Sequence, residues 1–446
     1  MRRIHLIGIG GTGLSAIARL LHARGWQVSG CDRQASPTLD ALRAQGMNVH
    51  IGHDPAHLRS GVDLVLRTSA LPADHPEVQA ARAAGIPVLT RREFLPTLTQ
   101  GYRTLAVAGT HGKTTTTAML AWALAAAGQD PTALIGGEVP PWGNVRLGQS
   151  PWFVIEADEY DHMFWGLTPE VAVLTTLELD HPDLFPTWDA YARAFAGFVD
   201  RVQRALVVAA FDPGVQRLLH DHPPRQPVLT FGWDDRADYW ADEVQWTGVG
   251  YRFVLRHRRQ ALAQVQLTVP GRHNVANALA ALAVVHHLGL DVNAAARGLA
   301  TFPGAGRRFT VVADQDGIAW VNDYAHHPTE IRATLAAARE RYPDRALWAV
   351  WQPHTYTRVR ALWDAFIRAF EAADHVIVSE IYAAREAPLA GVSGQAIARA
   401  IQHPRVHYAA DLESVANALR AIQPPAAVVL LSAGDLPQVL TRLGLS

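Results

Sequence analysis

The pattern of hydrophobic residues along the chain predicts strands that alternate with helices. Short apolar runs end in Gly-rich or polar turns, and stretches with helical spacing follow them. Such alternation is typical of a doubly wound, Rossmann-like sheet of parallel strands. In the first hundred residues the pattern predicts strands at 4–9, 26–31, 62–68 and 86–89, and helices at 14–24 and 77–84.

Two further α/β units follow the first. The second has predicted strands at 105–108, 152–157, 171–177 and 205–209, an antiparallel patch within 228–268 and a helix at 273–287. The third has predicted strands at 319–323, 347–352, 375–379 and 428–432, and helices at 328–341, 359–373 and 413–421. We therefore predict a three-domain α/β fold with domains 1–102, 103–306 and 307–446 and a hinge near 303–306.

Composition narrows the functional classes. The net charge of -1 does not favour nucleic acid or an anionic membrane as a partner. The single cysteine, Cys31, cannot form an internal disulfide, which fits a reducing, cytoplasmic location. We find no run of about 18 apolar residues, so we expect no membrane-spanning helix. The N-terminal apolar stretch runs into glycines and is interpreted as a first strand, not a signal peptide.

The 40 basic side chains include only one lysine, and the other 39 (40 minus 1) are arginines. That lysine, Lys113, lies in the segment Gly109-Thr110-His111-Gly112-Lys113-Thr114-Thr115, directly after an apolar strand. A strand, a Gly-rich turn and a Lys-Thr pair that opens a helix form a phosphate-binding P-loop arrangement. Two residues, rather than four, separate Gly109 from Gly112, so the match to the common P-loop spacing is incomplete.

Acidic residues and a histidine follow two other strands of the second unit. Glu156 is the first choice as a Mg²⁺ ligand, because an acid at the end of a neighbouring strand holds Mg²⁺ in P-loop enzymes. Asp158, Glu159 and Asp161 could also contribute to metal binding, and the alternative interpretation is that they form a solvated turn. His181 follows the strand at 171–177 and is either a second metal ligand or a simple hydrogen-bonded residue.

The glycine loop after the first strand is ambiguous by itself. Gly10, Gly11 and Gly13 allow close backbone approach to a pyrophosphate, and Asp32 lies where an acid meets a ribose or base. The default interpretation is NAD binding by an oxidoreductase, and a purely structural turn is the alternative. Ser69 adds a hydroxyl at the same edge of the predicted sheet.

Three later segments also carry candidate ligands. Residues 271–277 open a helix, and Asn274 there either contacts a nucleotide or caps that helix. Arg307 and Arg308 at the hinge either reach phosphate charge or form a surface basic pair. Two strand-end clusters, at 322–328 and 351–358, together suggest a small polar pocket in which an Arg suits a substrate carboxylate.

In this order, the glycine fingerprint, Gly-Thr-His-Gly-Lys-Thr, Glu-Ala-Asp-Glu, Asp-His, Gly-Arg-His-Asn, Gly-Arg-Arg-Phe, Asp-Tyr-Ala-His-His-Pro and Gln-Pro-His resemble the motifs of the Mur ligases. The resemblance spans all three units. Within this family, the chain is similar above all to the branch that joins L-alanine to UDP-N-acetylmuramate. It implies that ATP phosphorylates the lactyl carboxylate and that the amine of L-alanine then attacks the acyl phosphate. It implies small-molecule substrates, with neither nucleic acid nor membrane as a partner.

The resemblance also implies roles for individual residues. It makes the first domain the UDP-substrate-binding domain, the middle domain the ATP-binding domain and the last the amino-acid-binding domain. The expected catalytic residues are Lys113, Glu156, His181 and Arg308, and the expected Mg²⁺ ligands are Thr114, Glu156 and His181. ATP is expected to contact Gly109, Thr110, His111, Gly112, Lys113, Thr114, Thr115, His273, Asn274, Asn277, Arg308 and Asp323. The other substrates are expected at Gly10, Gly11, Thr12, Gly13, Asp32, Ser69, Gly136, Gly137, Tyr324, His326, His354 and Arg358.

The chain also departs from the family pattern. Some relatives carry Arg at the position of Thr355, so the expectation for a substrate carboxylate shifts to Arg358. Several Mur ligases use a carbamylated lysine near the metal, which this chain lacks because Lys113 is its only lysine. The nearest alternative is the branch that recycles a preformed tripeptide onto UDP-N-acetylmuramate. A nicotinamide-dependent oxidoreductase and a P-loop motor or switch protein are more distant alternatives.

Overall fold

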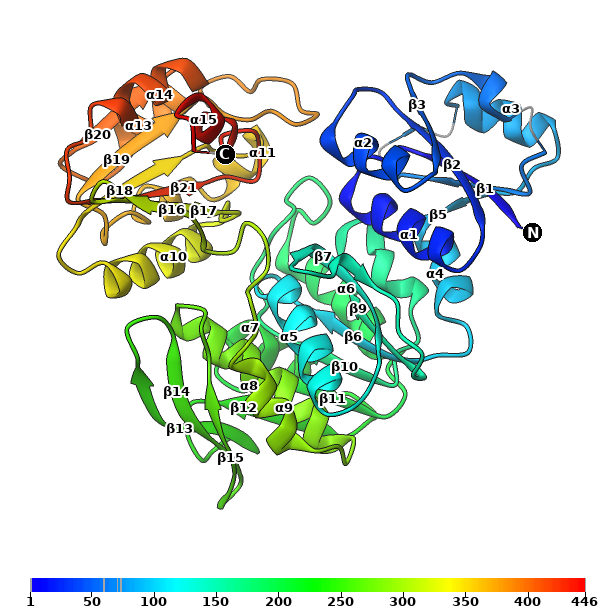
Figure 1. Cartoon of the computed structure of the whole chain (residues 1–446), viewed down its shortest axis with the longest axis horizontal. Coiled ribbons are helices and arrows are strands. Elements are labelled where there is room, and N and C mark those ends of the chain that lie inside the picture. Colours follow the sequence, from blue (N-terminus) through cyan, green and yellow to red (C-terminus); the bar gives the residue numbers. More distant parts are fainter. Residues whose placement is uncertain (1, 59–60, 70, 73, 446) are drawn as a thin grey trace.

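The computed structural model describes residues 2–58, 61–69, 71–72 and 74–445 and contains three separate β-sheets. Figure 1 shows the N-terminal unit in blue and the C-terminal unit in yellow to red, side by side above the middle unit. The predicted three-domain α/β fold is confirmed. Among the described residues, every helix falls short of the length and apolar character needed to cross a bilayer.

The N-terminal sheet is fully parallel, in the order β3-β2-β1-β4-β5. Helices α1, α2 and α4 cover one face of this sheet, and α3 with the short 3₁₀ helix η1 covers the other. The strands are β1 (Arg3–Ile7), β2 (Gln27–Asp32), β3 (Asn48–Ile51), β4 (Leu64–Arg67) and β5 (Val88–Thr90). The helices are α1 (Thr12–Ala23), α2 (Pro37–Ala44), η1 (Pro55–Leu58), α3 (Pro76–Ala83) and α4 (Arg91–Thr99).

The middle sheet has ten strands, in the order β15-β14-β13-β12-β11-β10-β6-β9-β7-β8. Its strands are β6 (Arg103–Ala108), β7 (Thr132–Val139), β8 (Gly143–Arg146), β9 (Trp152–Glu156), β10 (Val171–Leu174), β11 (Ala205–Ala209), β12 (Val228–Gly232), β13 (Tyr239–Trp246), β14 (Tyr251–His257) and β15 (Gln260–Gln266). Its helices are α5 (Lys113–Ala126), η2 (Tyr160–Gly166), α6 (Trp188–Val199), α7 (Pro213–Asp221), α8 (Arg272–His287) and α9 (Val292–Leu299). Side chains of β6 point alternately to the two faces, toward α5, α8 and α9 on one and toward α6 and α7 on the other.

The C-terminal sheet has the order β16-β17-β21-β18-β19-β20 and is parallel except for the β16–β17 pair. Its strands are β16 (Thr310–Gln315), β17 (Ile318–Asp323), β18 (Ala346–Trp351), β19 (His375–Ser379), β20 (Val406–Ala409) and β21 (Ala426–Leu431). Its helices are α10 (Pro328–Arg341), α11 (Tyr356–Ala361), α12 (Trp363–Phe366), α13 (Gly394–Ala400), α14 (Leu412–Arg420) and α15 (Gln438–Arg442). Helices cover both faces of this sheet.

Several predicted elements differ from the structure, and the strand predicted at 171–177, for example, ends at Leu174. The first strand ends at Ile7, because Gly8 takes a φ of +87° and begins the turn into α1. The predicted helix 359–373 is replaced by α11 and α12, which meet at Leu362 with non-helical dihedrals. The antiparallel patch begins only at β13, because β12 pairs in parallel with β11 and β13.

Candidate active site

The P-loop connects β6 to α5, and two of its glycines are required by its shape. Gly109 has a φ of +136° and Gly112 a φ of +79°, both in the left-handed half of backbone space. A Cβ on Gly109 would lie 2.1 Å from Thr175 Oγ1, on the neighbouring strand end. Only glycine fits there, so the loop turns tightly and directs the start of α5 toward the edge of the sheet where the parallel strands end.

Lys113 is the first residue of α5, and its ammonium folds back onto the loop. It donates to the carbonyl oxygens of Gly109 (2.6 Å) and Thr110 (3.2 Å) and lies 2.9 Å from Glu159 Oε2. Burial lowers the pKa of Lys113, but the negative charges of Glu159, Asp158 and Glu156 together outweigh burial and raise it. The Glu159 side chain is fully buried, so the solvated-turn interpretation is wrong for this residue. Its partnership with Lys113 was not predicted.

A cavity of ≈ 300 Å³ lies between the P-loop, the N-terminal end of α8 and the C-terminal unit. Most residues expected to contact ATP line it, whereas Gly109, Thr110 and Lys113 are not in its lining. Phe211, Phe231 and Trp233 form an aromatic wall of this cavity, which suits a flat base. The expected residues in the lining are His111, Gly112, Thr114, Thr115, His273, Asn274, Asn277, Arg308 and Asp323.

Two asparagines of α8 that line this cavity connect α8 to α5, the helix that follows the P-loop. Asn274 donates to the Pro270 carbonyl (2.7 Å) and accepts a bond from Asn277 (3.0 Å). Asn277 in turn accepts a bond from Thr116 of α5 (3.1 Å). The helix begins after Gly271 with no side-chain cap, so the alternative that Asn274 caps it is wrong.

Asp323 and Arg308 stand at the junction of the middle and C-terminal units. Both carboxylate oxygens of Asp323 accept backbone N–H groups, from Phe309 and Ala325 at 2.7 Å each. Burial nevertheless raises the pKa of Asp323. The guanidinium groups of Arg307 and Arg308 lie 4.8 and 5.0 Å from the ring centre of Tyr324. Arg307 also donates to the carbonyl oxygens of Ser432 and Gly434, so the surface-pair interpretation is wrong.

A second cavity, of ≈ 490 Å³, lies between the N-terminal glycine loop and the middle unit. The expected residues Thr12, Gly13, Gly136, Gly137, Glu156 and Tyr324 line it. Arg91, Glu138, Asn144 and Asp158 line it as well and were not predicted as ligands. Arg91, Glu138 and Asn144 lie in segments without a recognisable motif, whereas Asp158 lies in the Glu-Ala-Asp-Glu motif, where Glu156 was preferred as the ligand.

Four residues expected at the second cavity are not in its lining, namely Gly10, Gly11, Asp32 and Ser69. Asp32 instead accepts the Gly10 N–H through Oδ2 at 2.9 Å, and a Cβ on Gly10 would lie 2.9 Å from that oxygen. The Asp32 carboxylate therefore holds the glycine loop in place through the Gly10 N–H. Ala70, which follows Ser69, lies outside the described residues.

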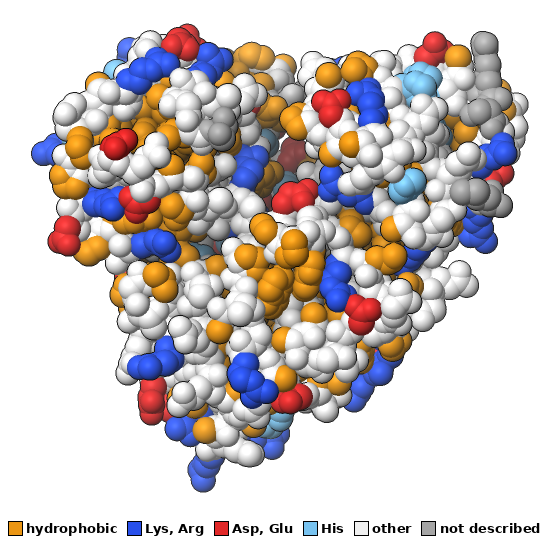
Figure 2. Space-filling view, in the orientation of Figure 1, with side chains coloured by type: hydrophobic (Ala, Val, Ile, Leu, Met, Phe, Trp, Pro, Cys, Tyr) orange, Lys and Arg blue, Asp and Glu red, His pale blue; other side chains and the backbone are white. Residues whose placement is uncertain are grey.

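The two cavities are adjacent, because Thr114 and Arg308 belong to the lining of both, and we call this shared part their junction. Figure 2 shows the molecular surface hollowed between the two upper units, with acidic and basic side chains beside the opening. Substrates that occupied the two cavities would approach each other at this junction. This arrangement permits transfer of a group between them.

The expected metal ligands are divided between the second cavity and its surroundings. Thr114 and Glu156 line the cavity, and Glu156 accepts the Gly136 N–H at 3.0 Å. His181 is outside the lining, with its Nε2 3.6 Å from Glu159 and 3.7 Å from Asp180. An oxygen-rich donor set of hydroxyl and carboxylate groups is the chemistry that Mg²⁺ prefers.

In the two clusters that were predicted to form a polar pocket, Arg358 instead makes an ion pair with the middle unit. Arg358 is buried and donates from Nε to Asp180 of the middle unit at 2.9 Å. Its Nη1 lies 3.2 Å from His354 Nδ1. Burial lowers the pKa of Arg358, but the negative charge of Asp180 outweighs burial and raises it. His326, His354 and Arg358 come together but are not in the lining of either cavity.

A second polar cluster joins the P-loop to the C-terminal unit. His111 donates to Glu330 of α10 (3.1 Å) and to Glu178 (3.2 Å), and Thr329 donates to Glu178 (2.8 Å). Burial lowers the pKa of His111, but the hydrogen bonds to the two carboxylates prevail and raise it to about 9. A cationic P-loop histidine therefore holds acids from two domains together.

Three family models match successive parts of the chain. The Mur ligase family, catalytic domain, matches residues 3–103, and the Mur ligase middle domain matches residues 107–285. The Mur ligase, glutamate ligase domain, matches residues 307–434. These matches exclude the oxidoreductase and motor-protein alternatives.

Similar proteins are found among curated sequences and solved structures. The UDP-N-acetylmuramate–L-alanine ligase of Solidesulfovibrio magneticus is 41% identical, with 98% of this chain and 97% of the relative aligned. That of Gloeobacter violaceus is 42% identical, with 98% and 95% aligned. The crystal structure of the UDP-N-acetylmuramate-alanine ligase of Thermotoga maritima has a TM-score of 0.84 at 28% identity and covers 100% of this chain and 98% of its own. A murein peptide ligase from Psychrobacter arcticus has a TM-score of 0.76, also at 28% identity, with coverages of 99% and 98%. Because the family models and the curated relatives extend over nearly all of its length, the chain belongs to the Mur ligase family.

Proposed function

We propose that the chain is an ATP-dependent ligase that joins L-alanine to the lactyl carboxylate of UDP-N-acetylmuramate, an early step of peptidoglycan synthesis. The observation that carries this proposal is the junction of the two cavities at Thr114 and Arg308. A carboxylate is a poor electrophile, and phosphorylation turns one of its oxygens into a good leaving group. The junction is where the γ-phosphate of ATP would meet that carboxylate.

The residues of the junction suit phosphoryl transfer, which depends on positioning and on neutralising charge. We assign Lys113 to the terminal phosphates, because its ammonium lies at the start of α5 and is held by Glu159 and two loop carbonyls. We assign Arg308 to the phosphoryl group in transit, because its side chain reaches both cavities. The Asn274–Asn277 pair and the aromatic wall would position the nucleoside.

Mg²⁺ is the expected metal, and the donor set beside the junction fits it. Thr114 and Glu156 would hold it from one wall of the second cavity, and His181 would lie nearby. When bound, Mg²⁺ neutralises charge on the β- and γ-phosphates. Glu156 is already oriented, because the Gly136 N–H donates to one of its oxygens.

We place the UDP portion of the substrate at the glycine loop, with Gly10–Gly13 near the diphosphate and Asp32 and Ser69 supporting the loop. Gly136 and Gly137 would face the sugar across the second cavity. L-alanine would enter from the side of Tyr324, with His326, His354 and Arg358 behind it. Since Arg358 already pairs with Asp180, a substrate carboxylate there would share its guanidinium. We propose a cytoplasmic location, where ATP and nucleotide-linked sugars are available.

The test uses the purified chain with ATP, Mg²⁺ and UDP-N-acetylmuramate labelled with ¹⁸O in the lactyl carboxylate. With L-alanine we expect one amide product by mass spectrometry, one phosphate released per amide, and one ¹⁸O atom in that phosphate. A phosphate without label would contradict the acyl-phosphate route. If L-alanine were inert and the preformed tripeptide active, the chain would be the recycling ligase instead.

A further inference from the structure

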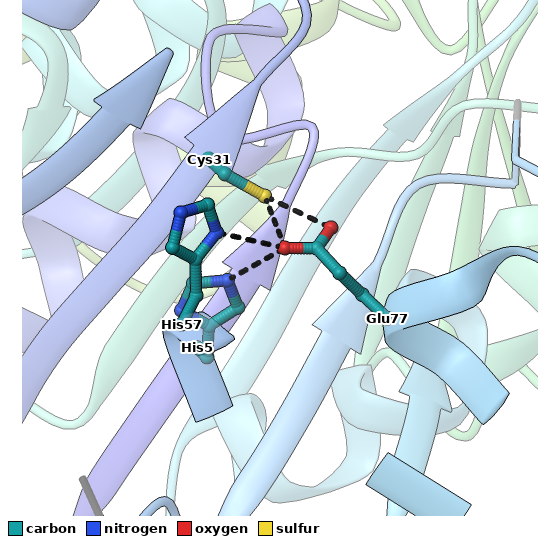
Figure 3. Close-up of side chains that lie close together, drawn as sticks. All are labelled: His5, Cys31, His57 and Glu77. Atoms are coloured by element: carbon teal, nitrogen blue, oxygen red, sulfur yellow. Dashed lines mark hydrogen bonds and ion pairs between the residues drawn. The ribbon is translucent and has the colours of Figure 1, made fainter. Parts of the chain in front are cut away.

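Five histidines, the only cysteine and a glutamate gather on one face of the N-terminal sheet, away from both cavities. Glu77, on α3, is fully buried, and His57 of η1 donates to its Oε1 at 2.9 Å. Cys31 of β2 lies 3.3 and 3.2 Å from the two carboxylate oxygens. Figure 3 shows these side chains and His5 of β1 directed toward one point from four different elements. The remaining members are His50, which stacks on His57, and His53 and His75 beside Glu77.

His5 shows why a hydrogen-bonded network alone does not complete this cluster. Ser29 donates its hydroxyl to the Ile4 carbonyl (3.4 Å), so its oxygen is left to accept the Nδ1–H of His5 (3.0 Å). The other ring nitrogen, Nε2, then carries a lone pair. It faces Glu77 Oε1 at 3.9 Å and has no hydrogen-bond partner, and the side chain is fully buried. In this tautomer a buried lone pair and a carboxylate oxygen face each other without a hydrogen bond, and a cation between them would satisfy both.

The spacing of the ligand atoms fits a tetrahedral metal ion. Bonds of about 2.0–2.3 Å from Zn²⁺ to nitrogen, oxygen and sulfur give edges of about 3.3–3.8 Å between neighbouring ligands. The distances from Glu77 Oε1 to His57, Cys31 and His5 are 2.9, 3.3 and 3.9 Å. The candidate ligand atoms of all four residues lie within 4.8 Å of one another. Small side-chain movements would therefore complete the coordination.

We propose that His5, Cys31, His57 and Glu77 bind one Zn²⁺ or a similar thiophilic divalent ion as a structural site of the N-terminal domain. One thiolate, two imidazoles and one carboxylate form a closed, four-ligand set, and the hydrogen bond from His5 to Ser29 supplies the supporting contact that orients a metal-bound histidine. The site is separate from the reaction centre, because none of the four residues lines either cavity.

The site would also stiffen the loop that we assign to the UDP substrate. The Cys31 carbonyl accepts the N–H groups of Gly8 (2.8 Å) and Ile9 (3.1 Å), and the next residue, Asp32, accepts that of Gly10. An ion bound to the Cys31 thiolate would hold the end of β2, and with it the glycine loop. This consequence rests on the proposed function, whereas the metal site itself does not.

The test measures metal binding by the full-length chain after chelator treatment. We expect one equivalent of Zn²⁺ that Cys31→Ala does not bind, together with a reversible rise of the melting temperature. With Co²⁺ as a probe we expect a thiolate-to-metal charge-transfer absorption, which Cys31→Ala lacks. His57→Ala should weaken binding strongly, and Ser29→Ala, which removes only the orienting oxygen, should weaken it about 10–100-fold. His22→Ala, a histidine of α1 outside the cluster, is the matched control and should bind as the unchanged chain does.

Several results would overturn the site. One is an unchanged chain that binds no more Zn²⁺ than Cys31→Ala, and another is a Co²⁺ complex without the thiolate absorption. If Cys31→Ala fails to fold, the Zn²⁺ affinities of His57→Ala and Ser29→Ala are compared with that of the unchanged chain instead. Equal Zn²⁺ affinity in all of these variants would assign the cluster to hydrogen bonding alone. None of these measurements depends on ligase activity, so their failure would leave the proposed function standing.

Discussion

Replacing the only lysine by arginine tests whether the P-loop requires a slim cation. In Lys113→Arg the charge stays, but the head group becomes broad and planar. The ammonium now lies 2.6 Å from Gly109 O and 2.9 Å from Glu159 Oε2, and its side chain is only 14% exposed. A guanidinium cannot enter this space without displacing the loop or leaving the phosphate-binding position.

The size of the effect follows from two contributions. Overpacking a filled site costs about 1–3 kcal/mol. A lost charge-assisted hydrogen bond to the phosphates costs about 1.5–3 kcal/mol more. Together they predict a fall in kcat/KM of about 10²–10⁴-fold, since about 1.4 kcal/mol corresponds to a factor of ten.

The assay is phosphate release coupled to amide formation, with unfolding by urea measured in parallel. Lys113→Met removes the charge and leaves Glu159 buried without a cation, so we expect a loss of about 3–5 kcal/mol in unfolding free energy. Arg236→Lys, at a side chain that is 87% exposed, is the control and should change stability by less than about 0.5 kcal/mol. If Lys113→Arg kept kcat/KM within about threefold of the unchanged chain, the steric reasoning would be refuted.

Three further predictions concern other parts of the site. Arg358→Met leaves Asp180 buried without its partner and should lower the unfolding free energy by about 3–5 kcal/mol in urea titrations; an unchanged midpoint would show that the pair contributes nothing. The pKa of His111 is raised to about 9 from 6.5, so the stability it contributes is complete below pH 6.5 and is lost as the pH rises through 9. In urea titrations, the unfolding free energy of the unchanged chain should therefore fall between pH 6 and pH 10 by ~2–3 kcal/mol more than that of His111→Gln. Equal falls in the two proteins would contradict this. Asp32→Ala frees the Gly10 N–H and should raise KM for the UDP substrate more than KM for ATP; equal rises in steady-state kinetics would argue against a local effect on the glycine loop.

The sequence predicted the elements that position the site better than it predicted the contacts within it. Buried parallel strands have strong apolar runs, and glycines mark the turns that follow them, so β1, β6 and the P-loop were placed nearly correctly. The break between α11 and α12 was missed, because the helical spacing of apolar residues continues through Leu362 and only the local dihedrals interrupt it.

Contacts between domains were the least accessible to sequence reasoning. Glu159 was not distinguished from its acidic neighbours, since only the folded chain buries it against Lys113. The pairing of Arg358 with Asp180 joins residues that are 178 positions apart, and the link from His111 to Glu330 joins residues 219 apart. Motif spacing carries no information about such distant partners. The cavity lining at Arg91 and Asn144 was missed for the same reason.

The shared wall at Thr114 and Arg308 has a consequence for chemical inhibition. A single compound that extends through both cavities, with a flat heterocycle at one end and an anionic group at the other, would contact both residues at its midpoint. Substitutions that weakened such a compound at this midpoint would also disturb the place where the two natural substrates meet. Resistance arising there would therefore carry a cost in catalysis, whereas resistance at the outer ends of either cavity would not.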